Sequence, residues 1–412
     1  MQVRPHFPEY SIARLDFCLK MLRYAVKTRQ YTNNLLLSPF SAEVALSMAY
    51  HGSTGRTKKE ISQVLGLHDD YGTHDVAHAL RQIRLDETAE NEYNDLVPND
   101  NHELHMANGA FFDKNVYLSR NYIAEMEKLF QSVIQDIDFN DDHDDAAVRY
   151  INEFIEAHTK DNVHDLLSPL DVPNIDAKFI LVSALHLRAR WDQQFDRTKT
   201  RIKPFTTAAG ISVLVDTMHK RFINYKVHLS KELDGAMFLE MPFTTGYCSA
   251  IFILPGKTLP GKSKQATRAS PDQGLASLIR TLTAEKLQHA MRMLCYQLHV
   301  TVQLPRFHVE QCWDLQPMLK WLGMPTAFDE EMADFSDICQ LSQLSVQTLK
   351  QKACIHLDEE GVDASVTTEV VLISGGGSGE AEFIADRPFL FLIRHEATNT
   401  IMLMGHVCDP SQ

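Results

Sequence analysis

The first clear pattern in the chain is helical. Within residues 10–26, the apolar residues Ile12, Leu15, Leu19 and Leu22 recur three or four positions apart. A helix turns once in about 3.6 residues, so this spacing puts them on one face. The pattern predicts an amphipathic helix that packs this face against a core.

A second helix is predicted to begin at Ser38 and Pro39. A serine oxygen can accept a hydrogen bond from an unpaired amide of the first turn, and proline in that turn gives up no helical bond. Apolar residues follow until Gly52, where we expect the helix to end.

Beyond Asn108, helix-like and strand-like segments alternate. Residues 121–131 and 145–158 have helical spacing, whereas residues 179–187 and 237–241 are short β-rich runs. No repeat of fixed period is present, and no linker rich in proline and serine divides the chain into halves. The sequence therefore predicts an α+β architecture.

The most informative segment, residues 361–372, alternates with period two. Every second residue is apolar or small, namely Val362, Ala364, Val366, Thr368, Val370 and Leu372. The residues between them are polar, namely Asp363, Ser365, Thr367 and Glu369. This pattern is typical of a half-buried strand. Small residues follow at 374–379 and predict an exposed loop. The segment is either a permanently paired edge strand or a strand in one state and a loop in another.

Composition and charge exclude several classes of protein. The chain has 412 residues, of which 44% are hydrophobic and 23% charged, as in ordinary globular proteins. Its 40 Lys and Arg residues against 54 Asp and Glu residues give a net charge of −14, so nucleic acid is not expected as a partner. Every apolar run ends well before the roughly 18 residues that a membrane span needs, so no membrane association is expected.

Three features bear on the compartment. Residues 1–10 lack the apolar region of a signal peptide, and no asparagine is followed by Ser or Thr at the second position after it. The cysteines are odd in number, widely spaced and predicted to be free thiols: Cys18, Cys248, Cys295, Cys312, Cys339, Cys354 and Cys408. These features favour an intracellular protein, although a chain that had lost a signal peptide would look the same.

Two polar stretches are predicted to be surface loops. Residues 255–273 carry Lys257, Lys262, Lys264 and Arg268 among Gly, Pro and Ser, as in a basic insertion. This stretch is either a solvated loop or a site for an anion or a partner. Residues 86–103 are acidic.

No group of residues points to an enzyme or a metal site. His74 and His78 have helical spacing but no third ligand. The acidic run 141–145 lacks the glycine and the last glutamate of a calcium loop, and suits a helix N-terminus better. The glycine cluster at 375–379 is not followed by the Lys-Ser/Thr pair of a phosphate loop, and no G-x-S-x-G motif is present. We therefore expect no cofactor and no metal.

Several segments match motifs of one known family, in that family's order. They are residues 34–41 (NLLLSPFS), 166–169 (LLSP), 190–196 (RWDQQFD), 304–307 (LPRF), 322–324 (LGM) with 327–328 (AF), 333–336 (ADFS), 358–361 (DEEG), 387–393 (RPFLFLI) and 404–407 (MGHV). On these motifs the sequence resembles the serpins from Leu15 to Pro410.

The resemblance implies a single domain over residues 1–412, with three β-sheets, eight or nine helices and an exposed reactive-site loop at about residues 361–387. It also implies that a serine protease cleaves the loop and forms an acyl-enzyme. The cut loop then inserts as a new strand into the central sheet and distorts the protease before hydrolysis is complete. Burying the inward side chains of that strand at about 1.5–3 kcal/mol each releases on the order of 10 kcal/mol.

The resemblance assigns the hinge of this loop to ten residues: Glu359, Glu360, Gly361, Val362, Asp363, Ala364, Ser365, Val366, Thr367 and Thr368. Their alternation suits insertion, because no proline and no inward charge interrupts it. Val362 and Val366 are larger than the small residues usual in the family at these positions. We therefore expect slower insertion, which favours cleavage as a plain substrate.

Other positions match the sheet itself. Glu359 and Arg306 correspond to a charge pair at the top of the central sheet near Trp191, in the region called the breach. Ser38 and Ser41 correspond to the shutter below it. Two shutter positions depart from the family: Ser183 stands for the usual asparagine, and Gln351 for the usual histidine. Since both partners of one bond have changed, we expect a Ser183–Gln351 hydrogen bond in its place.

The scissile bond stays open among several positions. The family spacing counted from Gly361 places the specificity residue at Gly375, and counting back from Pro388 places it at Gly377, with Gly376 between them. Upstream candidates are Leu372, Ile373 and Ser374. No Lys or Arg lies between Gly361 and Arg387, so an elastase-like or chymotrypsin-like protease is favoured over a trypsin-like one.

These observations predict a monomeric inhibitor of serine-type endopeptidases that acts as a suicide substrate. The alternative is a non-inhibitory serpin that binds a partner protein through its surface, as a decoy or regulator. Family habit favours an extracellular location, whereas the missing signal peptide and glycosylation sites and the cysteines favour the cytoplasm.

Overall fold

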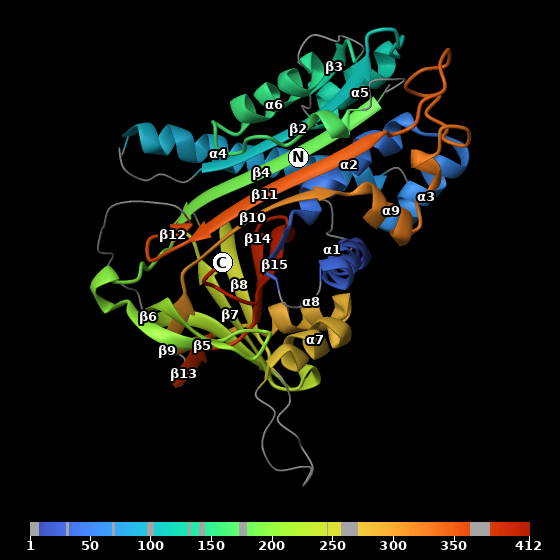
Figure 1. Ribbon diagram of the computed structural model, residues 1–412. Helices are drawn as coiled ribbons and strands as arrows, with labels where there is room; N and C mark the ends of the chain where they lie inside the picture. Colours follow the sequence, from blue (N-terminus) through green and yellow to red (C-terminus); the bar gives the residue numbers. More distant parts are fainter. Residues whose placement is uncertain are drawn as a thin grey trace.

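Helices and strands alternate along the chain much as its hydrophobic spacing predicts (Figure 1). In this computed structural model the described residues are 8–29, 33–67, 71–96, 103–130, 133–139, 145–172, 179–244, 246–256, 271–362 and 380–412. They form nine α-helices, within the expected number: α1 (Pro8–Arg29), α2 (Pro39–Gly52), α3 (Gly55–Leu65), α4 (Tyr71–Leu96), α5 (Arg120–Phe130), α6 (Ala146–His158), α7 (Pro271–Thr281), α8 (Ala284–Arg292) and α9 (Gln316–Leu322).

The strands follow the period-two segments. They are β1 (Leu35–Leu37), β2 (Glu103–Asp113), β3 (Val133–Ile137), β4 (Phe179–Arg190), β5 (Arg201–Thr206), β6 (Ser212–Ser230), β7 (Ala236–Pro242), β8 (Cys248–Leu254), β9 (Cys295–Pro305), β10 (Phe307–Asp314), β11 (Thr348–Leu357), β12 (Gly361–Val362), β13 (Glu380–Ile384), β14 (Phe389–His395) and β15 (Thr400–Val407). The predicted α+β class is confirmed.

The first two predicted helices are confirmed, and the second begins where the sequence predicts. The first helix extends a few residues beyond the predicted range at both ends. The second begins at Pro39, and the side-chain oxygen of Ser38 accepts a hydrogen bond from the amide of Ser41. This bond satisfies one amide of the first helical turn, which is why the Ser-Pro pair fixes the start of α2.

One predicted loop is wrong. Residues 86–96 of the acidic stretch 86–103 belong to α4, which runs from Tyr71 to Leu96. Glu, Ala and Leu are good helix formers, and this stretch has no Gly or Pro before Pro98 to end the helix. Polarity alone therefore indicated exposure but did not indicate a loop.

The described strands form two hydrogen-bonded sheets, not the three that the resemblance implies. One sheet has six strands in the order β10-β11-β12-β4-β2-β3, and the other has nine, with β5 paired to β6. The long strand β6 joins what would otherwise be separate sheets. It pairs with β5 at its beginning, with β9 along its middle and with β7 at its end.

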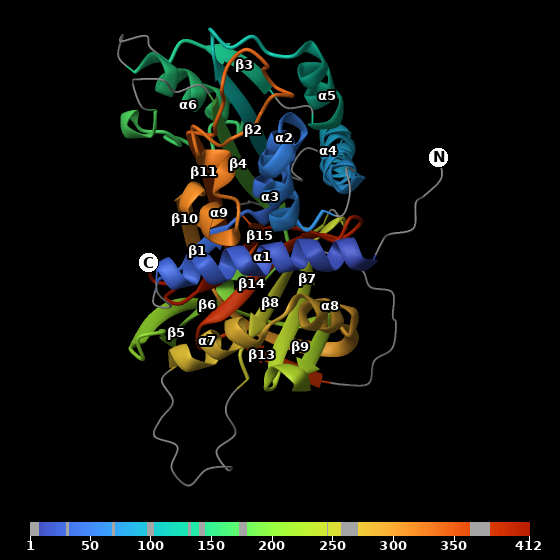
Figure 2. The same cartoon turned by 90° about the vertical axis from the view of Figure 1, so that its right-hand side faces the viewer.

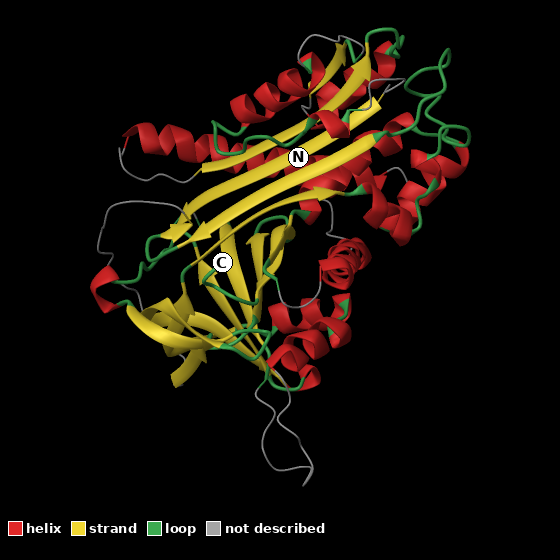
Figure 3. Cartoon of the chain, in the orientation of Figure 1, coloured by secondary structure: helices red, strands yellow, loops and turns green. Residues whose placement is uncertain are grey.

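The six-stranded sheet is covered on both faces (Figure 2). On one face, Val148, Ile151 and Ile155 of α6 pack in a small core against Val182 and Ala184 of β4. On the other, α2 and the nine-stranded sheet enclose the main core, which includes Leu185 and Leu187. Successive side chains of β4 therefore pack alternately into the small core and the main core, because side chains alternate between the two faces of a strand. Figure 3 shows helices above and behind the six-stranded sheet, which is the upper one in that view.

No helix in the part of the chain that the structure describes is both long and apolar enough to span a membrane.

Candidate functional site

Strand β12 occupies the place where the six-stranded sheet splits. Strands β4 and β11 pair directly and in parallel from Thr348 to Cys354 of β11. Beyond Cys354 the short β12 lies between them, with Val362 opposite both Leu357 of β11 and Ala189 of β4. The sheet is therefore closed at one end and open to an additional antiparallel strand at the other (Figure 1).

Glycine is required at the entrance of this split. Gly361 has φ +149°, and a Cβ built on it would lie 2.0 Å from the carbonyl oxygen of Ala189. Any other residue would therefore push β12 away from β4. The sequence marked Gly361 as part of a motif, but only the close approach of β4 gives the physical reason for it.

A tight turn at residues 358–360 delivers the chain into the split. The carboxylate of Asp358 accepts hydrogen bonds from the amides of Glu360 (2.9 Å) and Gly361 (3.2 Å). Trp191 fixes this turn with two hydrogen bonds. Its amide donates to the carbonyl of Glu360 (2.9 Å), and its indole N–H donates to that of Asp358 (3.0 Å). The ring of Trp191 is itself fully buried and stacked on Phe243.

The buried carboxylate of Glu359 binds Arg306, the residue that joins β9 to β10. Arg306 donates to its Oε1 from Nε (2.9 Å) and from Nη2 (2.6 Å), and the hydroxyl of Thr200 donates to the same oxygen. Glu359 is 1% exposed and Arg306 40% exposed. Burial opposes the charge of Glu359, but the bonds from Arg306 and Thr200 outweigh it, so the pKa of Glu359 lies below its usual value. The carboxylate thus stays ionised at neutral pH.

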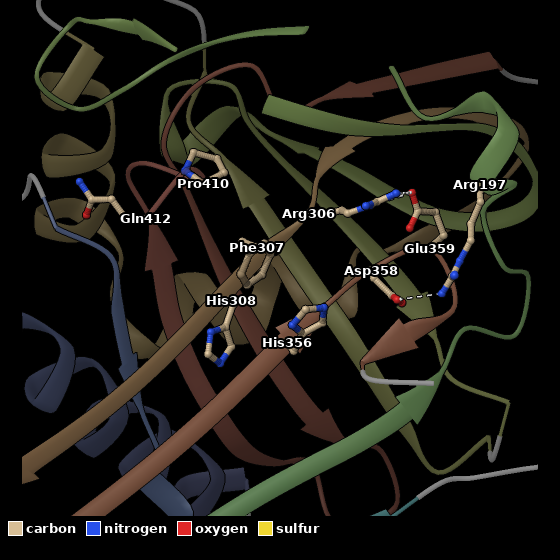
Figure 4. Close-up of a pocket in the computed structure, with 9 residues that line it drawn as sticks. All are labelled: Arg197, Arg306, Phe307, His308, His356, Asp358, Glu359, Pro410 and Gln412. Atoms are coloured by element: carbon tan, nitrogen blue, oxygen red, sulfur yellow. Dashed lines mark hydrogen bonds and ion pairs between the residues drawn. The ribbon is translucent and has the colours of Figure 1, made fainter. Parts of the chain in front are cut away.

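A second, more exposed ion pair flanks the first. The guanidinium of Arg197 lies 2.7 Å from Glu360 and 3.5 Å from Asp358. A cavity of about 330 Å³ opens between these contacts and the end of the chain (Figure 4). Its lining consists of Arg197, Arg306, Phe307, His308, His356, Asp358, Glu359, Pro410 and Gln412.

The breach residues predicted from the sequence thus lie together. Trp191, Arg306 and Glu359 meet at the split, as expected from their motifs. Sequence reasoning missed Thr200 and Arg197. Both follow the RWDQQFD segment closely, but no spacing marks a lone threonine or arginine as a partner of a carboxylate more than a hundred residues later.

The serines predicted for the shutter lie below the split, at the start of α2. The hydroxyl of Ser38 is 2.8 Å from that of Ser41 and 2.8 Å from the carbonyl oxygen of Met402 in β15. The side chain of Gln351 bonds the backbone of Ser38 twice, accepting from its amide (3.0 Å) and donating to its carbonyl (2.7 Å). Gln351 therefore ties β11 to the helix beneath the sheet.

The predicted Ser183–Gln351 hydrogen bond is wrong. The two residues are neighbours in the register of β4 and β11, but Ser183 donates instead to the Oδ1 atom of Asn108 in β2 (2.9 Å). Gln351 is occupied by Ser38, so the two side chains satisfy different partners. Where Ser183 lies opposite Gln351, β4 and β11 are joined by backbone pairing and not by a hydrogen bond between these two side chains.

The remaining predicted site residues lie outside the described residues. These are the hinge positions from Asp363 to Thr368 and the scissile candidates Leu372, Ile373, Ser374, Gly375, Gly376 and Gly377. Most of the basic stretch 255–273 also lies outside them, and its last residues belong to α7.

Comparison with known proteins identifies the family. The family model described as "Serpin (serine protease inhibitor)" matches residues 13–410. The chain belongs to the serpin family. Among curated relatives of this serpin, human serpin B4 is 28% identical over 413 residues, covering 97% of this chain and 99% of the relative. Mouse plasminogen activator inhibitor 1 is also 28% identical, over 96% of this chain and 91% of the relative.

Solved structures agree over the whole fold. Serpin48 of the insect Tenebrio molitor superposes with a TM-score of 0.79 at 27% identity, covering 98% of this chain and 99% of that one. Native protease nexin-1, solved with heparin, gives 0.79 at 25% identity, covering 97% and 99%. Thyroxine-binding globulin in complex with thyroxine, at 24% identity, shares the fold. The serpin fold thus also occurs in a protein named for a different role.

Proposed function

We propose that this serpin inhibits serine-type endopeptidases as a suicide substrate whose cleaved loop inserts between β4 and β11. The observation that carries the proposal is the position of β12. At the open end of the sheet, Gly361 and Val362 already pair with β4, and Val362 pairs with β11 as well. An incoming strand therefore has a defined starting point and direction.

The pairing of β12 also supplies a register for the rest of the strand. If the ladder continues, Ala364 pairs with Leu187 and Val366 with Leu185, since Val362 already pairs with Ala189. Ala189, Leu187 and Leu185 all belong to the main core. The apolar residues of the alternating segment would then face that core, which supports the burial energy on the order of 10 kcal/mol that insertion releases.

The polar residues of the segment also suit this register. Asp363 would lie between Arg188 of β4 and His356 of β11, on the face opposite the main core. Arg188 is partly exposed and His356 exposed. An acidic residue between two basic side chains on a partly hydrated face is electrostatically favourable. Both faces of the alternating segment therefore fit the site that β12 begins to fill.

The target is proposed from the loop sequence. No Lys or Arg lies between Gly361 and Arg387, so a protease that requires a basic residue before the cleaved bond is not the favoured target. Leu372, Ile373 and Ser374 suit chymotrypsin-like and elastase-like pockets, whereas cleavage at Gly375, Gly376 or Gly377 would bring no side chain to the pocket. We propose the upstream positions, with the protein acting as a monomer. Its location, extracellular or cytoplasmic, stays a prediction.

The test is incubation with elastase-like, chymotrypsin-like and trypsin-like proteases. We expect a complex that survives boiling in detergent with one of the first two, and a released C-terminal fragment whose mass identifies the cleaved bond. Val366→Arg should be cleaved without forming the complex, because a charge cannot enter the main core. Asp363→Ser, which alters only the polar face, should still form it.

The second candidate is a non-inhibitory serpin that binds a partner protein. The observation in its favour is the glycine run at 375–377, which offers no side chain to a protease pocket. Cleavage without a stable complex for every protease tested, together with no rise in thermal stability after cleavage, would refute inhibition by loop insertion and favour this second candidate.

A further inference from the structure

A group of metal-ligating side chains lies beside the split but outside the hinge itself. It consists of His308, Glu310 and Cys354, and one ligand atom from each lies within 4.8 Å of the other two. Among the residues that the structure describes, no other group of this kind has three members. The sequence analysis expected no metal, and the histidine pair that it considered and set aside, His74 and His78, is not part of this group.

The register of β10 and β11 brings these side chains together. Glu310 lies opposite Cys354 in the antiparallel pair, and His308 lies one step along the strand on the same face. In β10, buried residues alternate with residues open to solvent, and both His308 and Glu310 are among the latter. Each residue can therefore reach a common point above the sheet, since opposite and diagonal neighbours on one face are within side-chain reach.

The distances suit one small ion. The Nε2 atom of His308 lies 3.3 Å from the Sγ atom of Cys354. Two such ligands of tetrahedral zinc, with bonds of about 2.1 and 2.3 Å, would lie about 3.6 Å apart. The Oε1 atom of Glu310 is 2.7 Å from the Lys352 ammonium, which anchors the carboxylate in place. The Oε2 atom of Glu310 can then bind the ion.

The donor set selects the kind of metal. Imidazole nitrogen and thiolate sulfur are ligands of borderline-soft divalent ions, and one carboxylate is far from the oxygen cage that Ca²⁺ or Mg²⁺ requires. We propose that His308, Glu310 and Cys354 bind a zinc(II) ion whose fourth ligand is water. Three protein ligands and a water form a common zinc arrangement.

The site would clamp two strands together next to the hinge. It joins β10 to β11, whereas the proposed new strand enters between β11 and β4. His308 also lines the cavity that Glu359 and Asp358 share (Figure 4). The ligands lie on β10 and β11 only, and the inserted strand would separate β11 from β4. Zinc binding is therefore expected both before and after loop cleavage. The proposal therefore stands independently of whether the protein inhibits proteases.

The experiment uses tag-free, full-length protein that has been freed of metal and kept reduced. Zinc is titrated in competition with a chromogenic chelator, and cobalt(II) serves as a spectroscopic substitute. We expect one high-affinity ion per chain, a near-ultraviolet band from charge transfer between the thiolate and cobalt, and a thermal unfolding midpoint raised by a few degrees with zinc. Excess Ca²⁺ or Mg²⁺ should not displace the ion.

Variants decide whether these three residues are the ligands. Cys354→Ser should abolish the thiolate band, and both Cys354→Ser and His308→Ala should weaken zinc binding at least tenfold. The matched controls are Cys295→Ser in β9 and His289→Ala in α8, which change an exposed thiol and an exposed imidazole elsewhere. They should bind zinc like the parent protein.

Some outcomes would overturn the proposal. They are unchanged affinity in Cys354→Ser and His308→Ala, a cobalt spectrum without the thiolate band, or an equal loss in the control variants. Circular dichroism of each metal-free variant establishes that it folds. If either ligand variant does not, Glu310→Gln, which keeps the shape of the side chain, carries the same test.

Discussion

The contact between Arg306 and Glu359 is expected to contribute about 2 kcal/mol to stability. A hydrogen bond to a charged group contributes about 1.5–3 kcal/mol, and Arg306 makes two to one carboxylate oxygen. Because the Arg306 side chain is 40% exposed, water competes for it and reduces their combined value. Removing Arg306 alone should cost more, about 3 kcal/mol, since the buried Glu359 carboxylate would lose its cationic partner and keep the hydroxyl of Thr200.

The perturbation is a double-mutant cycle of Arg306→Met, Glu359→Gln and the two combined. Unfolding entropy is about 2.1 cal/mol/K per residue, so in a chain of this size a shift of one degree in the thermal midpoint corresponds to about 0.9 kcal/mol of unfolding free energy. Arg306→Met should thus lower the thermal midpoint by about 3 °C at pH 7. The coupling between the two substitutions should be about 2 °C, measured by circular dichroism at a fixed heating rate.

The coupling should also depend on pH. The pKa of Glu359 lies below its reference value of 4.5 in the folded protein, because bonds from Arg306 and Thr200 outweigh burial. The stabilisation is therefore fully present above about pH 4.5 and is lost as pH falls through the folded pKa. A coupling below about 0.5 kcal/mol at pH 7, or one that persists unchanged in acid, would refute this reasoning.

Three further predictions concern other parts of the sheets. Gly361→Ala would place a Cβ 2.0 Å from the carbonyl oxygen of Ala189, so amides at the split should lose protection in hydrogen exchange. Ser183→Ala would leave the buried Oδ1 of Asn108 without its 2.9 Å hydrogen bond and should cost about 1–2 kcal/mol in urea unfolding, whereas Ser183→Thr should cost less. Burial lowers the pKa of His406 from 6.5 to about 4. The contribution of His406 to the free energy of unfolding should therefore be fully present above pH 6.5 and be lost as pH falls towards 4. In His406→Gln, the loss of unfolding free energy over this range should be smaller by about 3 kcal/mol.

Local pattern predicted most of the elements and the start of α2, but not every helix end and not the arrangement of the sheets. Ser38 and Pro39 marked the start of α2 because capping depends on neighbouring residues alone. The acidic residues 86–96 belong to α4 and not to the predicted loop, because polarity indicates exposure to solvent and not backbone conformation. The number of sheets depended on β6, whose three successive partners are distant segments of the chain.

In the candidate site, too, some features were predictable from the sequence and others were not. Its motifs marked Trp191, Arg306 and Glu359, and these residues do meet. Hydrogen-bond partners were less predictable: Ser183 and Gln351 are adjacent in register, yet each is satisfied elsewhere. A side chain bonds whichever group the packing brings nearest, and that group belongs to another element of the fold.

Three features could be read from the order of residues alone: the alternation of residues 361–372, the absence of Lys and Arg between Gly361 and Arg387, and the motifs of the serpin family. These are properties of neighbouring residues or of their order. Three others required the folded chain: β12 enters between β4 and β11, Gly361 must lack a side chain, and ligand atoms of His308, Glu310 and Cys354 lie within 4.8 Å of one another. Each of these depends on the pairing of strands, and pairing joins residues whose separation along the chain carries no local signal.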